Sequence, residues 1–81
     1  MKTQGIYQIA THDTVLYIGQ SVNAEARLKQ HKRLLERNLH FNDRLQKFYN
    51  EHKEDVVVWN VVEQVIFREL LTNREIYYIK S

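Results

Sequence analysis

Residues 5–19 read GIYQIATHDTVLYIG, and this stretch decides the fold. Its two flanks are rich in β-branched and aromatic residues, and its middle is polar. That pattern is typical of two strands joined by a short turn. We therefore expect a β-hairpin with strands over about Ile6–Ala10 and Val15–Ile18. The second strand is continuously apolar, which predicts that it is covered on both faces of a sheet.

The hairpin carries a pair of tyrosines and a pair of glycines. If Tyr7 and Tyr17 lie directly opposite each other, the turn centres on His12 and the two rings share one face. Gly5 and Gly19 are the only glycines in the chain. We expect them at the two ends of the hairpin, where the backbone bends or lies close to another group. Tyrosines that simply pack on a helix would give the same pattern.

A long helix follows the hairpin. Ser21 is a suitable N-cap, and no glycine or proline interrupts the residues from Val22 to about Arg37. Apolar residues at helical spacing, Ala24, Leu28 and Leu35 among them, predict the buried face. Asn38 is suited to end this helix because asparagine tolerates a left-handed C-cap.

The second half of the chain contains a helix, a strand and a last helix. Asn42 or Asp43 can cap a helix that runs to about His52, and a polar turn follows at residues 53–55. The β-branched run Val56–Val62 predicts a strand. The last helix is expected over about Phe67–Lys80. A capping box formed by Thr72 and Glu75 would instead start it at Thr72.

The predicted order is strand, strand, helix, helix, strand, helix. It indicates an α/β or α+β domain with a small sheet covered by helices. A length of 81 residues predicts one domain, residues 1–81. The chain has no cysteine, which suits a reducing cytoplasm, and no apolar run long enough to span a membrane. The net charge of +2 is compatible with nucleic acid as a partner. Most of the positive charge lies between Arg27 and Lys53, on the predicted middle helices.

At this point the sequence resembles the GIY-YIG nucleases. Gly5-Ile6-Tyr7 and Tyr17-Ile18-Gly19 are the two halves of the family's name. Residues in the order of that family's active site follow them: Arg27, His31, His40 and Glu75. The resemblance covers nearly the whole chain and is strongest to the catalytic domains of phage and intron homing endonucleases. It implies a three-stranded antiparallel sheet flanked by three helices, and metal-dependent hydrolysis of phosphodiester bonds in double-stranded DNA. It also implies a cytoplasmic site of action in a phage-infected or bacterial cell.

Hydrolysis of a phosphodiester needs a group that removes a proton from water and groups that stabilise charge on the phosphate. Arg27 can form two hydrogen bonds to a phosphate. One carboxylate, with waters and phosphate oxygens, is enough to hold Mg²⁺ or a similar cation such as Mn²⁺. The resemblance assigns that role to Glu75. Taken singly, each of these residues would be an ordinary surface side chain.

The resemblance also implies roles for the aromatic and imidazole groups. Tyr7 takes or relays a proton, and Tyr17 orients water or phosphate. Because a free tyrosine has a pKa near ~10, either ring needs a nearby cation to act as a base at neutral pH. His31 can relay a proton or bind phosphate, and His40 matches a loop histidine of the homing members. We expect Tyr7, Tyr17, Arg27 and Glu75 to converge on one concave surface.

One part of the family pattern is missing. The family commonly places an asparagine after the last helix, and this sequence has none there; Asn73 lies at a different position. The chain is therefore expected to be the catalytic module of a homing-type endonuclease or a small stand-alone member. Two other functions stay open. One is a nucleic-acid-binding domain without catalysis that uses the basic middle helices, and the other is a protein-interaction domain in which every tyrosine is core.

Overall fold

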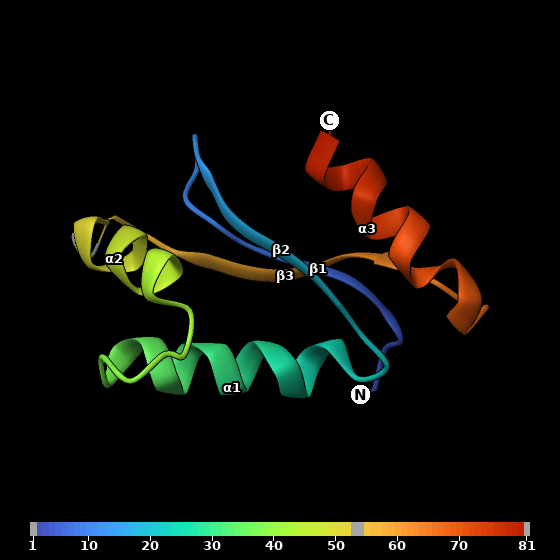
Figure 1. The fold of residues 1–81 in the computed structure, drawn as a ribbon, viewed down its shortest axis with the longest axis horizontal. Coiled ribbons are helices and arrows are strands. Elements are labelled where there is room, and N and C mark those ends of the chain that lie inside the picture. Colours follow the sequence, from blue (N-terminus) through green and yellow to red (C-terminus); the bar gives the residue numbers. More distant parts are fainter. Residues whose placement is uncertain (1, 53–54, 81) are drawn as a thin grey trace.

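The computed structural model describes residues 2–52 and 55–80. The predicted polar turn at 53–55 lies mostly outside this part. The order of the elements is the predicted one (Figure 1). They are β1 (Gly5–Ala10), β2 (Val15–Ser21), α1 (Ala24–Glu36), α2 (Asp43–Glu51), β3 (Val58–Gln64), the 3₁₀ turn η1 (Arg68–Leu70) and α3 (Leu71–Lys80).

The three strands form one antiparallel sheet in the order β2-β1-β3. β1 is the central strand, and nearly all of its residues are buried. β2 is an edge strand, and helices lie on both of its faces as predicted, α2 on one and α3 on the other. The cover is incomplete, because Val15 is 55% exposed and the rest of β2 apart from Gly19 is only partly buried.

The register of the hairpin differs from the predicted one. Tyr7 pairs with Gly19, and Ile9 pairs with Tyr17, so the two tyrosines are diagonal neighbours rather than direct partners. Their side chains still lie on the same face, because Tyr17 is two residues from Gly19, the partner of Tyr7. The turn is closed by a hydrogen bond of 2.8 Å from the Thr11 amide to the Thr14 carbonyl oxygen. The turn is therefore centred between His12 and Asp13, and not on His12 alone as predicted.

The strand boundaries also move. β2 continues through Gly19, so this glycine lies inside a strand and not at the end of the hairpin. β3 is displaced by two residues from the predicted Val56–Val62. Val56 is 82% exposed and precedes the strand, because the pairing of β3 with β1 begins only at Val58. β-branched composition located the strand but not its ends.

The helix ends follow the chemistry of their caps. Asn23, not the predicted Ser21, caps α1: its side-chain oxygen accepts a hydrogen bond from the Ala26 amide. Asn38 ends the helix in the left-handed conformation (φ 58°). Bonds from the Asn38 and Leu39 amides to carbonyls of the last turn complete this cap. Asn42 caps α2 through a 3.0 Å bond to the Leu45 amide, as predicted.

The last helix begins close to the predicted boundary. Phe67 precedes the turn η1, which continues directly into α3. Thr72 therefore lies within a helix and is not its first cap. In the part of the chain that the structure describes, no helix is both long and apolar enough to cross a membrane.

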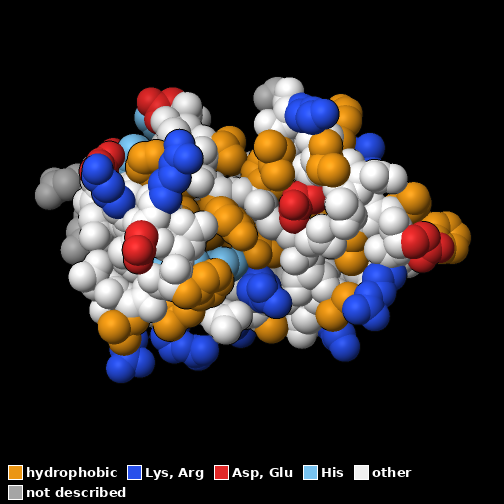
Figure 2. Space-filling model, viewed as in Figure 1, with side chains coloured by type: hydrophobic (Ala, Val, Ile, Leu, Met, Phe, Trp, Pro, Cys, Tyr) orange, Lys and Arg blue, Asp and Glu red, His pale blue; other side chains and the backbone are white. Residues whose placement is uncertain are grey.

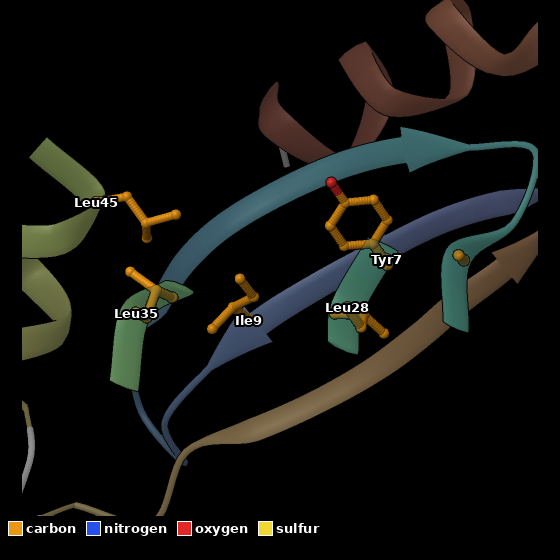
Figure 3. Packing of buried hydrophobic residues seen from close by; sticks show 6 residues of the cluster. Tyr7, Ile9, Leu28, Leu35 and Leu45 are labelled. Atoms are coloured by element: carbon orange, nitrogen blue, oxygen red, sulfur yellow. The ribbon is translucent and has the colours of Figure 1, made fainter. Parts of the chain in front are cut away.

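Helices cover both faces of the sheet (Figure 1). On one face, α1 packs on β1 and β3, and α2 packs on β2. The core on this side contains Tyr7, Ile9, Leu28, Leu35 and Leu45, whose side chains converge in Figure 3. On the other face, α3 packs mainly on β2 and encloses a smaller cluster of Ile6, Val65 and Leu71. The side chains of β1 thus point alternately to the two faces of the sheet, so that Ile6 packs in one core and Tyr7 and Ile9 in the other.

Candidate active site

Tyr7 lies at the centre of the molecule on the middle strand. Only 1% of its side chain is exposed. Its ring extends across β2 at Gly19, where an added Cβ would lie 2.5 Å from Tyr7 Cζ and 3.0 Å from a ring carbon of Tyr17. Gly19 is therefore required by a close approach of side chains and not by a turn. The hydroxyl oxygen is 2.8 Å from Nε2 of His31.

His31 lies in the buried face of α1 between Leu28 and Leu35. The apolar stripe of this helix is thus continued by an imidazole that is 2% exposed. Burial, with smaller contributions from His40 and Arg27, lowers the pKa of His31 to about 4. Its ring is neutral at pH 7, and its Nδ1 lies 2.7 Å from Nε2 of His40.

His40 was predicted to lie in a loop, and the structure places that loop against the site. The side chain is 6% exposed. Burial lowers the pKa of His40 as well. Its Nδ1 accepts a 3.0 Å hydrogen bond from the Asn42 amide. The ring stacks on Phe41 at 4.4 Å between centroids, while Phe41 itself is 71% exposed.

Three further predicted residues, Tyr17, Arg27 and Glu75, affect the pKa of Tyr7. Tyr17 presents its ring 6.2 Å from that of Tyr7 and 5.2 Å from that of His31. Burial raises the pKa of Tyr7 most, and the charges of Tyr17 and Glu75 raise it further. The guanidinium of Arg27 opposes this shift. All six residues named from the sequence therefore lie within one electrostatic neighbourhood, which we call the candidate site.

The candidate site forms at the free edge of the sheet. Tyr7, His31 and His40 belong to the side covered by α1 and α2, whereas Glu75 comes from α3 on the opposite side. The Tyr7 ring lies against Gly19 of the edge strand, and the charge of Glu75 acts on it from the other side of the sheet. Convergence of these residues on one concave surface stays a prediction. Figure 2 shows a notch between two lobes that is bordered mainly by hydrophobic side chains, with histidine and basic side chains below it on the same face.

Two hollows flank Tyr17. One, of about 280 Å³, lies between β2 and α2 and is lined by Leu16, Tyr17, Asn42, Arg44, Leu45 and Phe48. The other, also about 280 Å³, lies between β2 and α3 and is lined by Val15, Leu16, Tyr17, Ile18, Tyr78 and Ile79. The larger hollow of about 460 Å³ lies behind His40 and away from Tyr7. Tyr17 is thus the predicted residue that lines both hollows beside β2.

The donor set limits what metal the site can hold. Glu75 is half-buried, and the only ion pair recorded among residues 2–52 and 55–80 joins other residues. In the same residues, no group of three or more histidine, cysteine or acidic side chains is arranged to hold a metal. A closed protein cage is therefore absent from the described part of the chain. A single carboxylate fits a hard cation that takes its other oxygens from water and phosphate, as Mg²⁺ does.

A second polar network fixes α3 on the sheet. Glu63 of β3 accepts hydrogen bonds from Arg74 Nε at 2.7 Å and Arg74 Nη2 at 2.6 Å, and from Tyr78 Oη at 2.9 Å. Arg74 immediately precedes Glu75. The network therefore sets the rotation of α3 and, with it, the position of the Glu75 carboxylate.

Gln46 was not among the residues predicted for the site, yet its side chain supports the candidate site. It is 8% exposed. Its oxygen accepts from the His40 amide at 3.1 Å, and its nitrogen donates to the Leu35 carbonyl at 3.0 Å. A glutamine next to Leu45, on the face that α2 turns to the core, is the signal that could have revealed it. A buried amide must be fully hydrogen-bonded.

Comparison with known proteins agrees with this geometry. The GIY-YIG catalytic domain, as a family model, matches residues 3–81. Intron-associated endonuclease 1 of Enterobacteria phage T4 is 33% identical over 79 residues, which are 95% of this chain and 32% of that protein. This chain thus spans about a third of the length of that relative. The catalytic domain of the homing endonuclease I-TevI superposes with a TM-score of 0.79 at 31% identity, covering 95% of this chain and 85% of that one.

The chain belongs to the GIY-YIG family of catalytic domains. Its fold is that of the catalytic domain of a homing endonuclease, which it matches over most of both chains. The three-stranded antiparallel sheet with three helices that the resemblance implied is confirmed.

Proposed function

We propose that residues 1–81 form one catalytic domain that hydrolyses phosphodiester bonds of double-stranded DNA with the help of a divalent cation. The observation that carries the proposal is that the Tyr17 ring lies 6.2 Å from that of Tyr7, with Arg27 and Glu75 near enough for their charges to act on the Tyr7 hydroxyl. These residues come from four elements, β1, β2, α1 and α3. A domain that only bound nucleic acid would not need them in one place.

Arg27 is the phosphate-binding group in this proposal. Its side chain is exposed at the rim of α1, close enough to Tyr7 and His31 for its charge to act on both. A guanidinium can donate two parallel hydrogen bonds to the phosphate and stabilise the charge that develops on it.

Glu75 is the group that would hold the cation, preferably Mg²⁺, with Mn²⁺ as a substitute. The bound cation would supply positive charge to the phosphate and lower the pKa of water beside it. The carboxylate fits because it is half-buried and is not engaged in the ion pair that anchors its helix.

Tyr7 and Tyr17 are assigned to the attacking water. Tyr7 is protonated at neutral pH, as a free tyrosine is, and burial with the charges of Tyr17 and Glu75 raises its pKa further. Positive charge from Arg27 and the substrate-bound cation acts in the opposite direction, so Tyr7 becomes a proton acceptor only when the site is filled. Tyr17 borders two hollows and is placed to orient water or phosphate.

DNA is the substrate that the surroundings favour. The outer face of α1 carries exposed basic side chains beside Arg27: Lys29, Lys32, Arg33 and Arg37. Their charge would hold the phosphate backbone whatever its sequence. The same face also supports the second candidate, a nucleic-acid-binding domain without catalysis. The relative in a bacteriophage supports action in the cytoplasm of an infected cell.

Plasmid cleavage separates these possibilities. The purified domain is incubated with supercoiled plasmid in Mg²⁺ or in EDTA, and DNA binding is measured in parallel. We expect nicked plasmid only with the cation, and its loss in Arg27→Ala with the fold intact. Binding without cleavage by the parent domain in Mg²⁺ and in Mn²⁺ would support the second candidate and overturn the first.

A further inference from the structure

A line of three hydrogen bonds runs from the backbone into the candidate site. The Asn42 amide lies 3.0 Å from His40 Nδ1, His40 Nε2 lies 2.7 Å from His31 Nδ1, and His31 Nε2 lies 2.8 Å from Tyr7 Oη. Each imidazole uses both of its nitrogens in this line. The tautomers of the two histidines therefore decide which group donates and which accepts in each of these hydrogen bonds.

The direction of the line is fixed at one end. A backbone amide can only donate, so Nδ1 of His40 must be the unprotonated nitrogen. A neutral imidazole has one donor and one acceptor, and His40 therefore carries its proton on Nε2 and donates to His31. His31 in turn accepts at Nδ1 and donates from Nε2 to Tyr7. The same reasoning excludes a doubly protonated His40, which would direct an N–H group at the Asn42 amide.

We propose that His40 is a positioning residue that fixes His31 in the tautomer that donates to Tyr7. The Tyr7 oxygen is then an acceptor, and His31 has no free electron pair with which to take the Tyr7 proton. The pair of histidines is thus not a route by which that proton leaves. Its effect is to stabilise negative charge on the Tyr7 oxygen, which rests on the proposed function of Tyr7 as a proton acceptor.

The surroundings hold His40 in the required orientation. Its ring is stacked on Phe41, and its amide is bound by the Gln46 side chain at 3.1 Å. Asn42 is itself fixed because its side chain caps α2 through the Leu45 amide. The donor at the start of the line is therefore part of a helix end and cannot rotate independently. Hydrogen bonds aligned in one direction also polarise and strengthen one another.

Nitrogen NMR of the histidine rings tests the tautomers directly. The domain is labelled with ¹⁵N-histidine and observed near pH 7, with exposed His12 as the internal reference for a ring that exchanges between tautomers. We expect His31 and His40 each in a single state, protonated at Nε2 and accepting at Nδ1. A proton on Nδ1 of either ring, or exchange between tautomers, would overturn the proposal. This measurement does not depend on catalytic activity, so it is separate from the test of the proposed function.

Two substitutions of His40 test the consequence for Tyr7. His40→Gln keeps an oxygen that can accept from Asn42 and an N–H group that can donate to His31. We expect an unchanged His31 spectrum and a kcat within about tenfold of the parent. His40→Leu removes the donor, so His31 should exchange between tautomers and kcat should fall about 10- to 100-fold, as for other supporting residues, with DNA affinity unchanged. Equal kcat in the two folded variants, or an unaltered His31 spectrum in His40→Leu, would show that His40 does not position His31. If His40→Leu does not fold, the parent spectrum and His40→Gln still decide the question.

Discussion

The two faces of the sheet use polar side chains in opposite ways. On the face covered by α1 and α2, the network of Tyr7, His31 and His40 is buried and its histidines are neutral at pH 7. On the face covered by α3, Glu63 and Arg74 form a charged pair whose side chains are 25% and 37% exposed. The first network points at the candidate site, and the second holds a helix in place.

The difference follows from solvent access. A charged group stripped of water is costly, so groups buried beside Tyr7 remain neutral and depend on hydrogen-bond direction. Near solvent, charge is inexpensive and a two-pronged pair gives a helix a defined rotation. The predictions below separate the two networks, beginning with the residue that links them.

Glu75 follows Arg74 in sequence but faces the candidate site. Glu75→Gln should reduce Mg²⁺-dependent cleavage by about a thousandfold or more, comparable with losing a major electrostatic group. Thermal unfolding should change little, because the anchoring pair remains. Glu69→Gln, in the exposed turn η1, makes the same change of charge and should cleave normally. Loss of cleavage in both variants would mean that overall charge, not Glu75, is responsible.

Acidification should weaken the neutral network first. The pKa of His31 is about 4 in the folded domain, below its usual 6.5. Below pH 6.5 His31 binds a proton in the unfolded chain, but in the folded chain it binds one only near pH 4. The free energy of unfolding therefore decreases as the pH falls from 6.5 to 4, by up to about 3 kcal/mol. The pKa of Glu63 is lowered by Arg74, so its contribution is lost only at lower pH. Urea unfolding at pH 7 and pH 5 measures the effect. His31→Gln should show a smaller decrease, with His40 supplying the remainder, and an equal decrease in both proteins would refute the assignment.

The two glycines offer a matched pair of substitutions. A Cβ at Gly19 would meet the Tyr7 and Tyr17 side chains, and a Cβ at Gly5 would meet the Glu63 backbone. Each alanine variant should lose about 1–3 kcal/mol of stability through overpacking. Only Gly19→Ala should also displace Tyr7 and reduce kcat of the protein that remains folded. Equal kcat values in the two folded variants would indicate that Gly19 is needed for the fold alone.

The smallest effect is expected from the exposed pair. Glu63→Gln keeps the shape of the side chain, but it removes the charge opposite Arg74 and replaces one acceptor oxygen with an NH2 group that cannot accept a hydrogen bond. Because exposed ion pairs contribute little, the melting temperature should fall by no more than a few degrees. Cleavage should decrease modestly, because α3 and Glu75 gain rotational freedom. A change in melting temperature as large as that of Gly19→Ala would show that this network is a main source of stability.

The sequence predicted the elements better than their mutual placement. Asn38 and Asn42 were assigned correctly because capping is local chemistry. The register of Tyr7 against Gly19 was missed, since it depends on an irregularity between Ile9 and Ala10 that composition does not reveal. The cover of β2 by helices on both faces was predicted, but its position at the edge of the sheet was not, because an apolar run does not show how many strands pair with it.

The candidate site shows the same limit. Residue types and order indicated Tyr7, Arg27 and Glu75. They did not indicate that these residues come from both faces of the sheet, near its edge. The burial of His40 could not be predicted either, because it depends on Gln46 and on the path of the loop between α1 and α2. Contacts between distant parts of the chain decide both features.

The two networks each end in a tyrosine hydroxyl, which allows one direct comparison. Tyr7→Phe and Tyr78→Phe each remove a single oxygen, the first bonded to His31 and the second to Glu63. Plasmid cleavage in Mg²⁺ by the two folded variants is the measurement. If the neutral network serves catalysis and the charged one serves folding, Tyr7→Phe is inactive and Tyr78→Phe cleaves at nearly the parent rate. Cleavage by Tyr7→Phe at the rate of the parent would contradict the account.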